Sequence, residues 1–353
     1  MAVEPESLEW SLPVPSVQEL AIQGLQTVPA SYVRDDTDII ITTPSDPSLR
    51  IPLIDMTKLV NPDSQQQEIQ RLHSACKEWG LFQIINHGVS DESLSNMKEH
   101  VRGFFDLPLQ EKKHWAQKPG SLEGYGQAFV TSEEQKLEWN DMIFLRTRPL
   151  QNRNLNFWPE KPQGFRKALE TYSEDLSRLA VSIIRFIAMG LGVEAQQYSE
   201  TYREGLYDIR MNCYPPCPEP ERVLGFNPHA DISGITLLLE CGDTAGLQVL
   251  KDGHWVVVEP IDGALVANLG HVTQIMSNGI YKAPDHRAMV NKSKQRLSIV
   301  TFCYPNSSAN IGPAEKLIKS GSPPLFTTLK CEEYFHRFYN RKLEVSFIDS
   351  LKI

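Results

Sequence analysis

The sequence predicts an α+β fold in which a double-stranded β-helix, or jelly-roll, core is flanked by N-terminal helices. Between residues 51 and 200, hydrophobic side chains recur at three- and four-residue steps, which places them on one face of a helix. After about residue 205 they recur at every second residue, in short runs separated by Gly, Asp and Pro turns. The 353 residues, of which 41% are hydrophobic, are enough to bury a sizeable core.

Four segments are expected along the chain. Residues 1–50 are polar and rich in turn residues, and we expect them to form an N-terminal arm that lies on the body of the protein. Residues 51–200 are expected to be mostly helical, with helices over 67–79 and 94–106 and one further long helix. The apolar face of this long helix comprises Leu169, Tyr172, Leu176, Leu179, Ile183, Ile187 and Leu191.

Residues 201–310 are expected to form the jelly-roll core. Alternating side chains predict strands over 210–214, 235–239, 247–250, 255–258, 264–268 and 296–304. A barrel of this kind encloses a cavity lined by alternate residues, so side chains far apart in the sequence can meet there. Residues 311–353 are expected to form a C-terminal helix over 331–339 and a tail, which could close the barrel mouth as a lid.

The run Asn227-Pro-His-Ala-Asp231 predicts a metal site. In an extended strand His229 and Asp231 point to the same face, and His286 supplies a third ligand from much later in the chain. Alone, a His-x-Asp pair is more often structural than metal-binding. Two imidazoles and one carboxylate, however, are the ligand set of non-haem Fe(II) oxygenases, in which the remaining positions stay open for a co-substrate and O2.

A second cluster predicts a site for an organic acid. Arg296 and Ser298 share one face of the expected strand 296–304, and a guanidinium beside a hydroxyl binds a carboxylate well. Arg210, Asn212 and Tyr214 also alternate, ahead of a proline turn, so they are expected to line the same cavity.

Together these motifs resemble plant 2-oxoglutarate/Fe(II)-dependent dioxygenases. The resemblance covers nearly the whole chain and includes NHG at 86–88, NCYPPC at 212–217, HAD at 229–231, SNGIYK at 277–282 and RLS at 296–298. Residues 14–20, 123–129 and 349–353 are most similar to the senescence-related and codeine O-demethylase-like group, which serves specialised metabolism.

The resemblance implies a cofactor, co-substrates and a reaction. Fe(II) is expected at His229, Asp231 and His286, with 2-oxoglutarate and O2 as co-substrates and ascorbate as reductant. The far carboxylate of 2-oxoglutarate is expected to bind Arg296 and Ser298, helped by Tyr214 and Asn212. The implied reaction is hydroxylation or oxidative O-demethylation of a hydrophobic or aromatic plant metabolite, with release of succinate and CO2.

The substrate pocket is a weaker expectation, drawn from the resemblance and from strand alternation. Its expected residues are Arg210, Tyr125, Phe129, Phe302 and Tyr304. Aromatic side chains at a cavity mouth suit a flat hydrophobic molecule, although aromatic residues at a period of two are as often part of a core.

Position 271 is a departure from the family, which usually has Asp where this chain has His271. An imidazole can donate, accept or ionise near neutral pH, so His271 either changes a buried hydrogen bond or alters the iron site or the pocket. Cys213, where the family often has Tyr, is a smaller departure. It is expected on the opposite face from Asn212 and Tyr214.

The composition favours a cytoplasmic protein that binds neither nucleic acid nor membrane. The net charge is −9 and the basic residues are scattered, whereas nucleic-acid binding requires a basic face. The first ten residues have no apolar segment, and the most apolar stretch, 179–193, is too short to span a bilayer. Six cysteines without a paired framework fit reduced thiols. A monomer is the default expectation.

Three other functions are compatible with the motifs. An oxidase of the same fold that uses ascorbate or its substrate alone also carries an Arg-x-Ser motif. A zinc hydrolase is disfavoured, because no residue for water activation accompanies the three ligands. A metal or small-molecule binding module without turnover is the third alternative.

Overall fold

The computed structural model describes residues 12, 14–34, 49–118, 120–127, 130, 134–319, 322–341 and 346–353. Its largest sheet has eight described strands in the order β1-β2-β10-β7-β12-β5-β4-β3, and only the β1–β2 pairing among them is parallel. Their bounds are β1 Leu53–Asp55, β2 Leu81–Ile85, β3 Gly124–Gly126, β4 Asp141–Arg148, β5 Leu206–Tyr214, β7 Ile235–Glu240, β10 Leu265–Leu269 and β12 Arg296–Tyr304.

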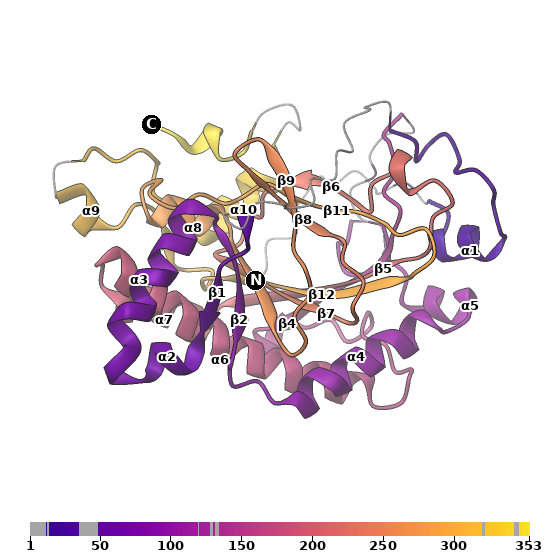
Figure 1. The fold of residues 1–353 in the computed structure, drawn as a ribbon, viewed down its shortest axis with the longest axis horizontal. Helices are drawn as coiled ribbons and strands as arrows, with labels where there is room; N and C mark the ends of the chain where they lie inside the picture. Colours follow the sequence, from indigo (N-terminus) through magenta and orange to yellow (C-terminus); the bar gives the residue numbers. More distant parts are fainter. Residues whose placement is uncertain are drawn as a thin grey trace.

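A smaller sheet lies over part of the larger one (Figure 1). Its four described strands run in the order β6-β11-β8-β9, all antiparallel. Their bounds are β6 Phe226–His229, β8 Leu247–Lys251, β9 His254–Val257 and β11 His286–Ala288. The two sheets form the jelly-roll core, so the expected α+β fold is confirmed.

Helices cover the outer face of the larger sheet (Figure 1). The longest, α6 (Phe165–Leu191), is amphipathic, and it is capped by Gly192, which adopts a left-handed conformation with φ 69°. Side chains of α6 share one hydrophobic core with alternate residues of β5, β7 and β12, for example Ile209, Leu237 and Ile299. The other residues of these strands therefore face the space between the two sheets.

The remaining helices mostly support this core. α3 (Pro62–Glu78) and α4 (Asp91–Phe105) pack against α6 and begin at side-chain caps, Asn61 and Ser90 respectively. The other described α-helices are α1 Val17–Ile22, α2 Met56–Val60, α5 Leu109–Lys112, α7 Ala195–Arg203, α8 His271–Met276, α9 Glu315–Lys319 and α10 Cys331–Tyr339. A short strand pair, β13 (Asn310–Ile311) and β14 (Leu329–Lys330), precedes α10. Within the described ranges, no helix is long and apolar enough to cross a membrane.

Most of the predicted elements are confirmed, but the region 51–200 is less helical than expected. It contributes β1 to β4, and β4 pairs with β5 along most of its length, so both regions share one sheet. The sequence DMIFLRTR of β4 alternates between the two faces of the sheet, a period of two that identifies a strand.

The described part of the N-terminal arm is tied to this strand. The carboxylate of Asp141 accepts hydrogen bonds from Ser16 Oγ at 2.6 Å and from the backbone N–H groups of Val17 and Gln18 at 2.8 and 3.2 Å. It also accepts from the Tyr125 hydroxyl at 3.2 Å. The carboxylate therefore binds the N-terminal end of α1 to the body of the protein.

Candidate metal centre and its cavity

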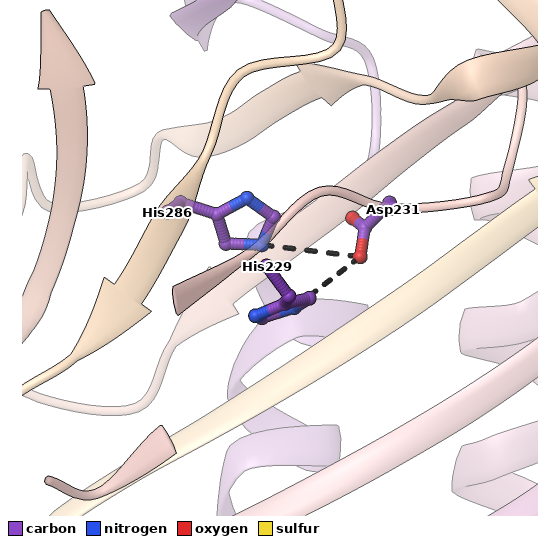
Figure 2. Close-up of side chains that lie close together, drawn as sticks. All are labelled: His229, Asp231 and His286. Carbon is purple, nitrogen blue, oxygen red and sulfur yellow. Dashed lines mark ion pairs between the residues drawn. The ribbon is translucent and has the colours of Figure 1, made fainter. Parts of the chain in front are cut away.

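Three side chains converge where β6 and β11 lie side by side. His229 ends β6, His286 begins β11, and the two residues are partners across the antiparallel ladder. Asp231 follows two residues after His229, beyond the end of the strand. Its Oδ1 lies 3.5 Å from His229 Nε2 and 3.9 Å from His286 Nε2 (Figure 2). One ligand atom from each residue lies within 4.8 Å of the others, so the structure brings the three predicted ligands together.

Hydrogen bonds orient each of these groups. Nδ1 of His229 lies 2.8 Å from the carbonyl oxygen of Asn227, and Nδ1 of His286 lies 3.1 Å from that of Pro284. Because a carbonyl can only accept, each Nδ1 carries the proton and each Nε2 presents a lone pair to the centre. This donor set, two imidazole nitrogens and a carboxylate oxygen, fits a divalent transition metal.

The carboxylate of Asp231 is held in the same way. Its Oδ2 accepts hydrogen bonds from Thr236 Oγ1 at 2.6 Å and from Asn268 Nδ2 at 2.8 Å, so Oδ1 remains directed at the imidazoles. Burial opposes its ionisation, but the two histidines and Thr236 outweigh burial and hold the pKa of Asp231 below its usual range. The site therefore presents a fixed anion.

A cavity extends from this centre between the two sheets. Most of its wall is apolar or aromatic, and among its polar residues Thr236 and Asn268 contact Asp231. Its further lining residues are Leu122, Met142, Phe144, Arg210, Asn212, Tyr214, Phe226, Ala230, Ile232, Thr236, Leu238, Leu247, Asn268, Arg287, Ala288, Arg296, Ser298, Val300, Phe302, Tyr304, Phe338 and Tyr339.

The predicted carboxylate-binding residues line the cavity from the neighbouring strands β5 and β12. Arg296 is the cross-strand partner of Tyr214, and Ser298 is that of Asn212. Asn212 Nδ2 donates to Ser298 Oγ at 3.3 Å, and the Arg296 guanidinium carbon lies 4.9 Å from the centre of the Tyr214 ring. The structure thus places all four predicted residues on one wall.

Arg296 has a buried partner that the sequence reading missed. Its Nε and Nη2 donate to the two carboxylate oxygens of Glu240 at 3.1 and 2.5 Å, and the two side chains are only 3% and 10% exposed. Its buried Nη1 has no hydrogen-bond partner within the described residues. A guanidinium held along one edge, with an unpartnered donor on another, fits a carboxylate ligand.

Three of the five residues expected to contact substrate line the cavity. Arg210 donates from Nε to Asn212 Oδ1 at 2.7 Å, Phe302 lies 6.4 Å from Phe144 between ring centres, and Tyr304 completes this strand face. Tyr125 is not among the lining residues. Its ring packs in the hydrophobic core and its hydroxyl binds the carboxylate that anchors α1.

The remaining expectations concern a loop and the C-terminal helix. Phe129 lies outside the described residues. The helix α10 contributes Phe338 and Tyr339 to the cavity wall, and its role as a lid stays a prediction. Met142 and Phe144 of β4 also line the cavity, and the alternation in 141–148 was the signal that could have found them.

His271 lies outside the cavity. It is the first residue of α8, and its backbone N–H donates to the carbonyl oxygen of Asp231 at 2.8 Å. Its imidazole lies 6.3 Å from the Phe347 ring, and Nδ1 has no hydrogen-bond partner in the part of the chain that the structure describes. Burial lowers the pKa of His271 to about 4, so the ring is neutral at pH 7.

Comparisons with known proteins agree with this geometry. Residues 51–161 match the family model described as the N-terminal region of a non-haem dioxygenase in morphine synthesis, and residues 207–305 match that of the 2OG-Fe(II) oxygenase superfamily. The oxoglutarate-dependent flavonoid 7-O-demethylase 1 of Ocimum basilicum is 42% identical over 99% of this chain and 94% of its own. Codeine O-demethylase of Papaver somniferum is 38% identical over 97% of both chains.

A solved structure extends the likeness to the fold. The crystal structure of JOX2 in complex with 2OG, Fe and JA superimposes with a TM-score of 0.87 at 33% identity, covering 98% of this chain and 99% of that one. The chain therefore belongs to the 2OG-Fe(II) oxygenase superfamily and is a 2-oxoglutarate- and Fe(II)-dependent dioxygenase.

Proposed function

We propose that this enzyme oxidises a hydrophobic, aromatic plant specialised metabolite by hydroxylation or oxidative O-demethylation, releasing succinate and CO2. The observation that carries the proposal is the aromatic cavity that opens directly onto the candidate metal ligands. The names of similar proteins also support it, since they include a flavonoid 7-O-demethylase, a codeine O-demethylase and a thebaine 6-O-demethylase.

The proposal assigns the metal to His229, Asp231 and His286. Their Nε2 and Oδ1 atoms are oriented by hydrogen bonds on their far sides, so little reorganisation is needed on binding. Bound Fe(II), together with 2-oxoglutarate and O2, supplies the oxidising power for cleavage of an unactivated C–H bond.

The far carboxylate of 2-oxoglutarate is assigned to Arg296 and Ser298, with Tyr214 and Asn212 beside them. The unpartnered Nη1 of Arg296 supports this assignment, because a buried donor without an acceptor is unfavourable until a ligand supplies one. Ser298 Oγ accepts from Asn212, so its own proton is free to be donated to the carboxylate.

The aromatic wall positions the substrate and excludes water. Phe144, Phe302 and Tyr304 provide aromatic surface that suits a flat ring, and Phe338 and Tyr339 of α10 line the same cavity. When an O-methyl carbon is presented to the metal site, hydroxylation gives a hemiacetal that releases formaldehyde and a free hydroxyl group. When a ring or alkyl carbon is presented, the product is an alcohol or a phenol.

Several further properties belong to the same proposal. Ascorbate is expected to maintain the metal as Fe(II). The six cysteines are free and buried, which supports a cytoplasmic enzyme. A monomer that binds no nucleic acid is expected, and light scattering during gel filtration with and without added RNA would measure both properties.

The test measures succinate and product together. Anaerobically purified protein is incubated in air with Fe(II), ascorbate, 2-oxoglutarate and a panel of phenolic, coumarin, flavonoid and alkaloid candidates. We expect succinate to form in step with one product that has gained an oxygen atom or lost a CH2 unit. His229→Ala should abolish iron binding and succinate, whereas His254→Ala, on an exposed residue of β9, should not.

Three outcomes would contradict the proposal. Product without succinate would favour the oxidase that uses ascorbate or its substrate alone. Bound iron without succinate or product from any candidate would favour a binding module, and iron-independent hydrolysis with bound zinc would favour a hydrolase.

A further inference from the structure

Among the described residues that line the cavity, positively charged side chains outnumber carboxylates. Among the described lining residues the only carboxylate is that of Asp231, which already binds Thr236 and Asn268 and faces the two histidines. The same wall includes three guanidinium groups, those of Arg210, Arg287 and Arg296.

Two of these cations have protein partners. Arg296 is neutralised by Glu240, which is not itself among the lining residues. Arg287 donates from Nε to Gln248 Oε1 at 2.7 Å, and its guanidinium carbon lies 4.2 Å from the centre of the Trp255 ring.

Arg210 differs, because its outer nitrogens are not used within the described structure. Its guanidinium carbon lies 4.3 Å from the centre of the Phe226 ring, and only Nε donates a hydrogen bond there, to Asn212. The charges of Glu138 and Asp231 act on Arg210, but neither residue forms an ion pair with it in the described structure. Glu138 is not a lining residue, and its Oε1 accepts from the backbone N–H of Asn227 at 3.0 Å. The two Nη groups are therefore available to a ligand.

Arg210 is connected to the candidate metal ligands through the ring of Phe226. The Phe226 ring on which it stacks lies 4.5 Å, between ring centres, from the imidazole of His229. On its own sheet, Arg210 is flanked by Phe144 of β4 and Val300 of β12, its cross-strand partners. A polar group bound by Arg210 would thus sit between the apolar wall and the candidate metal ligands.

Resting on the proposed function, we propose that the substrate is a neutral or anionic aromatic molecule that places an oxygen acceptor on Arg210, and that the cavity discriminates against protonated amines. The acceptor is a carboxylate, whose two oxygens can accept parallel hydrogen bonds from the guanidinium, or a single phenolic or carbonyl oxygen that accepts from its Nη groups. An ammonium group in the same place would meet an unpaired cation and no carboxylate outside the metal site.

The experiment compares three methoxynaphthalenes that differ only in the group on the far ring: a carboxylate, a hydroxyl or an aminomethyl group. Their dissociation constants are measured by titration calorimetry under nitrogen, with protein loaded with Fe(II) and 2-oxoglutarate. We expect the carboxylate and hydroxyl compounds to bind at least about tenfold more tightly than the ammonium compound.

Variants assign this preference to Arg210. Arg210→Met should weaken binding of the carboxylate compound by about tenfold or more and remove the order of affinities, while Arg210→Lys should keep the order. Arg203→Met removes a guanidinium whose side chain is 65% exposed on α7, and it should change none of the three constants.

Equal or tighter binding of the ammonium compound would overturn the inference, as would an Arg210→Met protein with unchanged constants. If none of the three compounds binds while the panel assay still yields succinate with a product, the substrate class is wrong and the proposed function stands. If succinate is also absent, the proposed function itself fails.

Discussion

Replacing Glu240 with alanine should destabilise the protein and, at the same time, tighten its binding of 2-oxoglutarate. In the native protein the carboxylate of Glu240 holds the Nε and Nη2 edge of Arg296 by two hydrogen bonds. The variant leaves a 3% exposed guanidinium without its counter-ion. Removing one partner of a buried ion pair costs about 3–5 kcal/mol, so we expect the free energy of unfolding to fall by that amount.

Binding of 2-oxoglutarate should change in the opposite direction. Its far carboxylate is expected to share Arg296 with Glu240, so two like charges flank one cation. Relief of about 1.4 kcal/mol of repulsion would tighten binding by about tenfold. Part of the lost stability should therefore return when the variant is saturated with 2-oxoglutarate, because a ligand that binds only the folded state stabilises it.

Urea unfolding and calorimetric titration with 2-oxoglutarate measure these two effects. The matched control is Glu174→Ala, which breaks an exposed ion pair with Arg178 and should cost less than about 0.5 kcal/mol. A Glu240→Ala protein as stable as this control would refute the reasoning on the buried pair. Weaker binding of 2-oxoglutarate would show instead that Glu240 is needed to orient Arg296.

Three further changes test the candidate metal ligands, the Arg296 site and the buried His271. Thr236→Val removes a hydrogen bond to Asp231 and should weaken Fe(II) binding by about tenfold to a hundredfold in a chelator competition; an unchanged affinity would contradict this. In Gly246→Ala the new Cβ would lie 2.6 Å from Cδ of Arg296, so the guanidinium must shift and KM for 2-oxoglutarate should rise by about tenfold, with a smaller change in kcat. The pKa of His271, about 4 in the folded protein, lies below the value of about 6.5 expected when unfolded, so the unfolded state binds the proton first as pH falls. The free energy of unfolding should therefore drop by up to about 3 kcal/mol between pH 6.5 and 4. Measured by urea unfolding, the stability of His271→Gln should depend less steeply on pH, and an equal pH dependence in both proteins would refute this role of His271.

The sequence predicted most of the candidate site because its patterns are short-range, whereas His286 was assigned as the distant third member of a known ligand set. His229 and Asp231 are two residues apart, and Arg296 and Ser298 lie on one face of a strand whose alternation is regular. The strand face of Arg210, Asn212 and Tyr214 was predicted for the same reason. These features depend on the backbone period alone.

The sequence did not predict the contacts between elements that are far apart in the chain. Glu240 lies on the cavity-side alternation of β7, but its pairing with Arg296 depends on the register between β7 and β12. Tyr125 occupies a three-residue strand between two glycines, where alternation carries no information, and its hydroxyl partner is Asp141. The cavity contacts of α10 likewise depend on where a C-terminal helix docks.

The carboxylate of Asp141 constrains how the protein can be shortened for study. It is 3% exposed and accepts two backbone N–H bonds and one hydroxyl bond from residues 16–18, and Met142, the next residue of β4, lines the cavity. A truncated protein that starts after residue 18 would leave this buried charge with fewer donors, directly behind the cavity wall. Expression designs that retain residues 16–18 therefore preserve the shape of the substrate site as well as the stability of the fold.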